Sequence, residues 1–179
     1  MKILETEPVK TVRAEKGRGR QFNSGYGIAS GEILIFLHSD TVFPENGLKI
    51  TDEYFKSGKN IVAAFRLKFS PDSLLLNLYS FFTRFDSMFT TFGDQCILLR
   101  RDTFELIGRF PDWPLFEDVN LFQKLRKITK IKKLKSYVIT SPRRFLSNGI
   151  LRQQLRNFIL ILKYLAGTTP GSLEKHYKS

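Results

Sequence analysis

The sequence has little cysteine and no long uninterrupted apolar run. The single cysteine, Cys96, excludes a disulfide framework and a zinc site built from several cysteines. The two longest apolar candidates, 74–92 and 158–166, do not provide the roughly 20 consecutive apolar residues that a membrane span needs. The longer one is interrupted by Arg84 and Asp86, and 158–166 is far too short. The polar stretch 1–21 has no secretory signal. These absences predict a soluble, cytoplasmic protein.

Acidic residues are scarce in the last third of the chain. Residues 1–120 carry 15 Lys and Arg against 16 acids, whereas 121–179 carry 14 cations against Glu174 alone, so the whole net charge of +12 resides there. Such an asymmetry indicates an anionic partner, which could be phosphate, nucleic acid or acidic lipid headgroups. For the run 124–135 alone, a solvated basic helix face is the alternative interpretation.

Apolar runs typical of strands alternate with periodic segments typical of helices. Strands are predicted at 9–12, 33–37, 61–69, 96–99 and 137–139, and helices at 18–30, 44–57, 74–89, 117–127 and 149–166. Because the run 33–37 is entirely apolar, we expect it inside a mostly parallel sheet with helices on both faces. The alternation predicts one α/β domain over 1–179, with helices 149–166 and 172–177 packed on or beside it.

Polar residues follow the 33–37 strand directly, where ligands bind in parallel α/β sheets. Asp40 is a candidate for holding Mg²⁺ together with water and substrate phosphates. Its other common use is as a turn or N-cap residue. His38 is a candidate ligand, and the alternative is a hydrogen-bonded structural histidine.

Two further acidic clusters stand at Asp94 and at Glu117-Asp118. The pair opens a predicted helix, a position that complementarity to the helix dipole alone favours. The functional alternative is that one of the two faces a cleft as a general base, with its pKa set by its neighbours.

An ordered set of short motifs resembles family 2 glycosyltransferases of GT-A fold. The motifs are Asn23-Ser24-Gly25, Ala29-Ser30-Gly31, Phe36-Leu37-His38-Ser39-Asp40-Thr41, Gly93-Asp94-Gln95, Glu117-Asp118 and Ser141-Pro142-Arg143-Arg144-Phe145. More narrowly, the sequence resembles a bacterial group whose metal motif reads His-Ala-Asp-Thr. The resemblance extends over about 16–177 and implies a GT-A-like, Rossmann-like fold.

The resemblance implies inverting transfer of a sugar from a nucleotide-diphosphate donor to an acceptor hydroxyl, assisted by Mg²⁺ or Mn²⁺. Carried over by position, Asp40 matches the acid that meets the metal and the diphosphate, and His38 stands where the first Asp of that motif would be. Asp118 matches the catalytic base, with Glu117 as its supporting neighbour.

The other carried-over residues fall into three groups by the part of the substrates they would contact. They are Arg18, Arg20 and Asn23 near the nucleotide, Asp94 and Gln95 in the acceptor and sugar pocket, and Arg143 and Arg144 as a pair suited to phosphate. Arginine suits phosphate because its planar fork makes two hydrogen bonds at once.

The family begins with two strands that hold the nucleobase and ribose, and we find no counterpart before 9–12. We therefore expect an N-terminally truncated domain whose exposed sheet edge favours a homodimer. One alternative is a catalytically inactive glycosyltransferase-like fragment. Another is a basic module that binds nucleic acid, which is disfavoured because the aromatic residues do not interleave with the cations.

The predicted helix 149–166 carries Arg152, Arg156 and Lys163 on one face. Such a helix could lie on an anionic surface at the inner face of a membrane, where a lipid-linked acceptor would be presented. Alternatively, its apolar side packs on the sheet and the cations are merely solvated.

Overall fold

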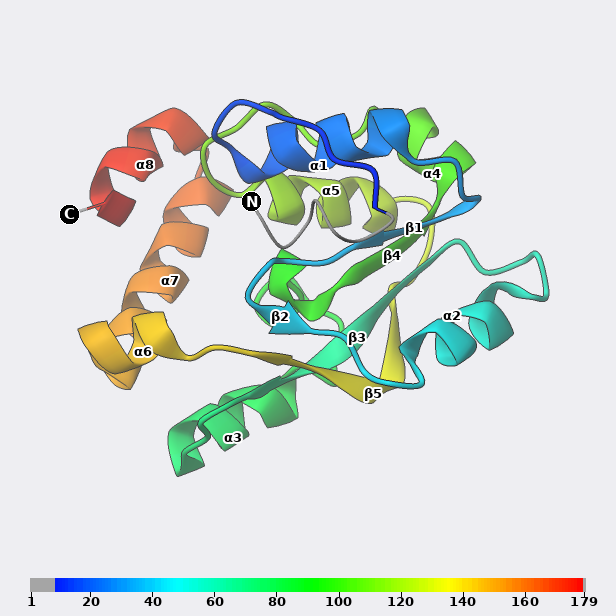
Figure 1. Cartoon of the computed structure of the whole chain (residues 1–179). Coiled ribbons are helices and arrows are strands. Elements are labelled where there is room, and N and C mark those ends of the chain that lie inside the picture. Colours follow the sequence, from blue (N-terminus) through cyan, green and yellow to red (C-terminus); the bar gives the residue numbers. More distant parts are fainter. Residues whose placement is uncertain (1–8, 179) are drawn as a thin grey trace.

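The computed structural model of the protein describes residues 9–178 and confirms the mixed α/β class (Figure 1). Its strands are β1 (Ile33–Phe36), β2 (Thr41–Val42), β3 (Val62–Phe69), β4 (Ile97–Arg100) and β5 (Lys132–Thr140). Its helices are α1 (Arg18–Ile28), α2 (Gly47–Phe55), α3 (Leu74–Phe82), α4 (Arg101–Leu106), α5 (Glu117–Arg126), α6 (Arg143–Asn148), α7 (Ile150–Leu165) and α8 (Pro170–Lys178), and a 3₁₀ helix, η2, covers Gly93–Gln95.

The sheet is mostly antiparallel, which corrects the expected mostly parallel one. Its strand order is β1-β4-β3-β5-β2, and of the pairings described only β3 with β5 is parallel. β1 is therefore an edge strand, where an interior strand was expected. The reason is physical, because an apolar run reports burial on both faces but not the direction of the neighbouring strands.

Successive side chains of β3 pack into two different hydrophobic cores, one on each face of the sheet. Val62 and Ala64 pack with Phe104 and Phe122 beneath the layer formed by α1, α4 and α5. The residues that alternate with these, Ala63, Phe65, Leu67 and Phe69, pack on the opposite face toward α2 and α3. Figure 1 shows these helices on the two sides of the sheet. The prediction of helices on both faces is thus confirmed.

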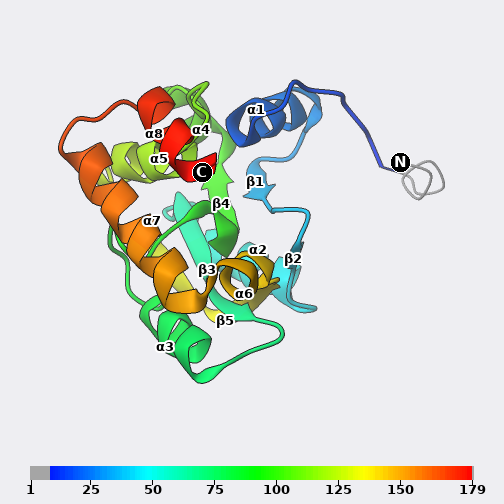
Figure 2. The same ribbon diagram turned by 90° about the vertical axis from the view of Figure 1, so that its left-hand side faces the viewer.

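A third core joins the C-terminal helices to α5. Leu160 and Ile161 of α7 pack against Phe116 and Val119, and Leu173 of α8 closes the cluster. This contact sets α7 across one end of the sheet (Figures 1 and 2). The space beneath α7 is the candidate site described below.

Several predicted elements differ in extent from those observed. Residues 9–15 have no regular structure, so the strand expected at 9–12 is absent there. α3 ends at Phe82 instead of residue 89 because Thr83 ties that end to β3: its hydroxyl donates to the Ser80 carbonyl over 2.7 Å and accepts from the Leu67 N–H over 3.0 Å. The basic run 124–135 is shared between α5 and β5, so it is not one helix face.

Candidate active site

A pocket of about 430 Å³ lies at the end of the sheet, beneath α7. Its charged lining consists of three acids and three cations, namely Asp40, Asp94, Asp118, Arg18, Arg143 and Arg144, together with His38. These residues come from segments far apart in the sequence. The structure brings the three carboxylates, which follow different elements, into one pocket.

Asp118 lies in the first turn of α5, and two backbone N–H groups hold its carboxylate. Its Oδ2 accepts the Gly93 N–H over 2.6 Å, and its Oδ1 accepts the Val119 N–H over 2.8 Å. Phe116, the N-cap residue, has a left-handed conformation with φ of 64°, which is uncommon for an aromatic residue and turns the chain sharply into the helix. Each carboxylate oxygen retains capacity for a second hydrogen bond.

Gly93 is required by the close approach of Asp118 and His38. A Cβ at this position would lie 3.0 Å from Asp118 Oδ2 and 3.3 Å from His38 Nε2. Both distances are shorter than ordinary van der Waals contact. The glycine therefore lets η2 pack directly against the carboxylate.

Glu117 lies behind the pocket and anchors Arg18. The residue is 1 % exposed, and its carboxylate accepts from Arg18 Nε over 2.6 Å and from Arg18 Nη2 over 3.3 Å. Burial, and next the charge of Asp118, raises the pKa of Glu117 to about 7, against the opposing effect of Arg18. Glu117 thus positions an arginine that itself lines the pocket.

Asp94 lines the pocket and has an unsatisfied carboxylate oxygen. Its Oδ1 is buried and has no hydrogen-bond partner among the described residues. Burial, and next the charge of Asp118, raises the pKa of Asp94 to about 7. A buried polar atom without a partner is unusual in a folded protein, and a ligand hydroxyl could satisfy it.

His38 and Asp40 lie in the connection between β1 and β2. Burial, and next the charge of Arg18, lowers the pKa of His38, so its imidazole is neutral at pH 7. Asp40 is exposed and lines the pocket. Within residues 9–178, no group of three or more His, Cys, Asp or Glu side chains is arranged to hold a metal ion. A cation here would need ligands from a substrate, as Mg²⁺ commonly does.

Three arginines line the pocket. Arg143 and Arg144 open α6 and line the pocket with Arg18. Burial, and next the charges of Arg18 and Arg156, lowers the pKa of Arg144. Such a concentration of positive charge favours binding of a polyanion.

Besides Glu117, three sequence-predicted residues lie outside the pocket lining, namely Arg20, Asn23 and Gln95. Arg20 pairs with Glu15 and Asp112 on the surface, reaching Asp112 Oδ2 from Nη2 over 2.8 Å. Asn23 donates to the Phe110 carbonyl over 2.9 Å and accepts the Phe110 N–H over 3.3 Å, so it secures the loop before α5. Local sequence cannot distinguish these structural partners from a nucleotide. Gln95 is the third residue.

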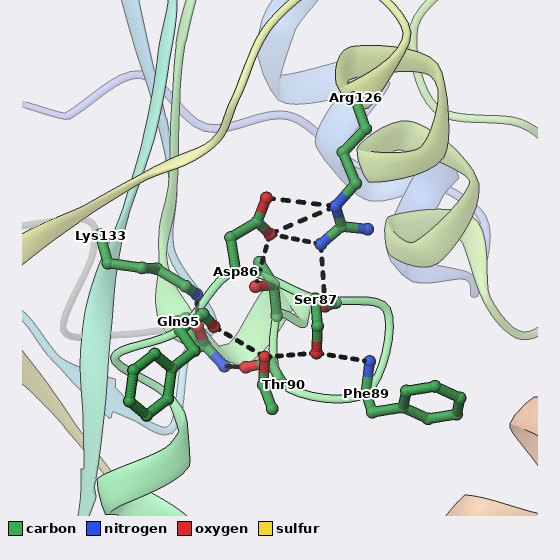
Figure 3. Close-up of polar contacts among 9 residues, drawn as sticks. Asp86, Ser87, Phe89, Thr90, Gln95, Arg126 and Lys133 are labelled. Carbon is green, nitrogen blue, oxygen red and sulfur yellow. Dashed lines mark hydrogen bonds and ion pairs between the residues drawn. The ribbon is translucent and has the colours of Figure 1, made fainter.

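Gln95 belongs to a buried polar network that holds the loop 83–92 (Figure 3). Its side chain donates to the Thr90 carbonyl over 2.6 Å and accepts from Lys133 Nζ. Arg126 of α5 contacts the same loop. Its Nη2 donates to Asp86 Oδ1 over 2.6 Å and to the Ser87 carbonyl over 2.9 Å. The network fixes the loop that carries Phe89 and Phe92 into the pocket.

Other pocket residues were not predicted from the sequence. Tyr79 of α3 lines the pocket, and burial, followed by the charges of Asp94 and Asp118, raises its pKa, which keeps the phenol neutral. α7 supplies the amides Gln154 and Asn157. Uncharged amides spaced three apart on a helix rich in leucine are a signal that could have identified this face.

Comparison with known proteins gives one result. Residues 2–113, more than half of the 179-residue chain, match the model of the family described as glycosyl transferase family 2. The match includes Arg18, His38, Asp40 and Asp94 and ends before Asp118. Neither the curated proteins nor the solved structures compared with this chain give a match.

Proposed function

The chain belongs to glycosyl transferase family 2, and we propose that its pocket transfers a sugar from a nucleotide-diphosphate donor to an acceptor hydroxyl with inversion at the anomeric carbon. The observation that carries the proposal is the meeting of Asp40, Asp94 and Asp118 with three arginines in one pocket. Carboxylates can transfer protons and hydrogen-bond sugar hydroxyls, and arginines bind phosphate.

Asp118 is the proposed base. An acceptor hydroxyl must lose its proton as it attacks the anomeric carbon, and a carboxylate oxygen of Asp118 takes that proton. The Gly93 and Val119 N–H groups orient this carboxylate without using all of its acceptor capacity. Holding the base in a fixed position reduces the entropy lost on reaching the transition state.

The arginines of the pocket are proposed to stabilise the leaving group. As the sugar–phosphate bond breaks, negative charge grows on the departing nucleoside diphosphate, and Arg18, Arg143 and Arg144 stabilise it. The bidentate contact with Glu117 fixes one of these guanidinium groups before the donor arrives. An oriented cation stabilises the transition state more than a mobile one.

Asp40 would hold Mg²⁺ or Mn²⁺, with neutral His38 as a second candidate ligand. A single accessible carboxylate in a pocket suited to phosphate fits a cation whose remaining ligands are water and diphosphate oxygens. When bound, that cation would neutralise charge on the leaving group.

Asp94 is the proposed contact for a hydroxyl of the transferred sugar or the acceptor. Its pKa of about 7 means that the carboxyl accepts or donates a hydrogen bond near neutral pH. Its unpartnered buried Oδ1 provides the acceptor. Gln95 supports this segment from behind through Thr90.

The test is a screen of nucleotide-diphosphate sugars with Mg²⁺ or Mn²⁺, measuring the nucleoside diphosphate released. Asp118→Asn should lower turnover by about 10²-fold to 10⁴-fold while sparing donor binding, because the base acts on the acceptor. Asp112→Asn is the matched control, since Asp112 is exposed and pairs with Arg20 outside the pocket. If no donor binds, or if Asp118→Asn turns over like the wild type, the proposal is wrong.

A further inference from the structure

Helix α7 faces solvent with its apolar stripe. Leu151, Leu155, Phe158, Leu162 and Leu165 recur at intervals of four and three, so they form one row along the helix. Their exposed fractions range from 41 % to 69 %. One apolar row of α7 is therefore exposed, whereas Leu160 and Ile161 pack against α5.

The inward face of α7 is partly polar and well satisfied. Gln153 is 2 % exposed; its Oε1 accepts from Asn148 Nδ2 over 2.8 Å and from Arg156 Nη2 over 2.9 Å, and its Nε2 donates to Asn157 over 2.7 Å. Rotating α7 to bury the leucines would break this network and expose Leu160. The outward orientation of the stripe is consequently determined by the fold.

Helix α3 and the loop after it extend this apolar surface. Leu74, Leu78, Phe81, Phe85 and Phe89 are between 43 % and 86 % exposed. The rings of Phe89 and Phe158 lie 5.6 Å apart, which joins the two sets. We call these ten residues the apolar face. Single exposed apolar residues are ordinary, whereas a contiguous set marks an interaction site.

The charges flanking the α7 half of the apolar face have one sign, whereas Asp72, Arg84 and Asp86 stand beside its α3 half. Residues 141–171 contain no acid and five cations, which are Arg143, Arg144, Arg152, Arg156 and Lys163. Apolar residues flanked by cations suit a surface that offers both hydrocarbon and negative charge. A second copy of the chain would instead bring like charges together, which disfavours self-association through this face.

We propose that the apolar face docks the protein on an anionic lipid bilayer, with α7 and α3 lying in the plane of the headgroups. No helix among the described residues is long and apolar enough to cross a membrane. Phe89 and Phe158 belong both to the apolar face and to the pocket lining, so docking brings the pocket to the lipid surface. The inference does not rest on the proposed function, because lipid binding requires neither donor nor acceptor.

The test is co-sedimentation with phosphatidylcholine vesicles, with and without about 30 mol% phosphatidylglycerol, at low and high salt. We expect binding to the anionic vesicles that weakens with salt. Leu155→Ser with Leu162→Ser should lower vesicle affinity about 10-fold or more, because two apolar side chains leave the bilayer. Leu48→Ser with Leu106→Ser is the matched control, since these leucines are 67 % and 79 % exposed elsewhere.

A second pair of variants tests the charges. Arg152→Gln with Lys163→Gln should weaken binding to anionic vesicles about 10-fold, and Lys49→Gln with Lys56→Gln on and after α2 should not. Equal binding to neutral and anionic vesicles, or no binding to either, overturns the proposal. So does a dimer in sedimentation equilibrium that Leu155→Ser dissociates, because the face would then be a contact between copies.

Discussion

The Gly93 N–H donates to Asp118 Oδ2 over 2.6 Å and so joins η2 to the first turn of α5. The two residues are 25 positions apart. This bond and the one from the Val119 N–H hold the carboxylate facing the pocket. The position of the proposed base therefore depends on the backbone N–H of a glycine. A side chain at that residue would push the carboxylate away.

Gly93→Ala should destabilise the protein and displace Asp118. The new methyl group would lie 3.0 Å from Asp118 Oδ2, and relieving that contact should cost about 1–3 kcal/mol in chemical denaturation. Gly25→Ala is the matched control, because a Cβ there meets open space within α1 and should stabilise the helix by about 0.5–1 kcal/mol. Equal stability of Gly93→Ala and the wild type would contradict the close packing.

Removing Arg18 should leave Glu117 as an unpaired buried charge. Arg18→Met is expected to cost about 2 kcal/mol, below the usual range for a fully buried pair because the Arg18 side chain is 44 % exposed. Adding Glu117→Gln should recover more than half of that loss in a double-mutant cycle. The cost of Arg18→Met should also shrink as the pH falls below about 7, where Glu117 takes up a proton. Additive effects at every pH would show that the pair is not coupled.

Asp94→Asn should stabilise the protein at high pH but not at low pH. The folded-state pKa of Asp94 is raised to about 7 from 3.8, so folding holds this proton more tightly than the unfolded chain does. Its contribution to stability is full below pH 3.8 and is lost as the pH rises through 7. The variant's gain in melting temperature over the wild type should therefore grow across that window.

Exposed Asp52 on α2 gives the control for this measurement, since water screens its charge. Asp52→Asn should leave the melting temperature close to that of the wild type. A gain for Asp94→Asn that does not change with pH would mean that Asp94 is ionised at little cost in the folded protein.

Asp40→Asn should remove the metal dependence of donor binding. In calorimetric titration with a nucleoside diphosphate, Mg²⁺ or Mn²⁺ should tighten binding to the wild type more than to the variant, because Asp40 is the only protein carboxylate proposed to hold the ion. Asp52→Asn should retain the full metal effect. An unchanged metal effect in Asp40→Asn would assign the ion to other ligands.

Arg126→Lys should loosen the loop 83–92 without unfolding the protein. Lysine keeps the charge but loses the planar fork that contacts Asp86 and the Ser87 carbonyl together. Amide hydrogen exchange should rise in that loop and stay unchanged in β3. Lys124→Arg, on the same helix, is the control. Faster exchange throughout the molecule would indicate global destabilisation instead.

Much of the fold was predictable where local pattern and tertiary context agree. The apolar-rich run 61–69 predicted a strand, which β3 confirms, and α5 begins at Glu117 as its acidic first turn indicated. The edge position of β1 was not predictable, because strand order depends on pairing between distant segments. The burial of Gln153 was not predictable either. A buried amide needs hydrogen-bond partners, and here the side chains of Asn148 and Asn157 provide them.

The candidate site followed the same rule. Asp40, Asp94 and Asp118 were identifiable as acids near element ends, and the structure brings them into one pocket. Arg20 and Asn23 sit in an equally suggestive stretch but are engaged by Asp112 and Phe110. The partners of Arg20 and Asn23 lie about 90 positions away in the sequence. Local sequence therefore cannot tell whether such a side chain faces a cavity or binds a distant loop.

The pocket is assembled by contacts of very long range, and this has a consequence for how the protein acquires its activity. Arg18 meets Glu117 across 99 positions, and Thr41 of β2 pairs with Thr140 of β5. Closing such large loops is entropically costly, so these contacts form after the local helices. A partly folded chain would have most of its helix content and no pocket. Nucleotide binding is therefore the sensitive reporter of complete folding, and circular dichroism is the insensitive one.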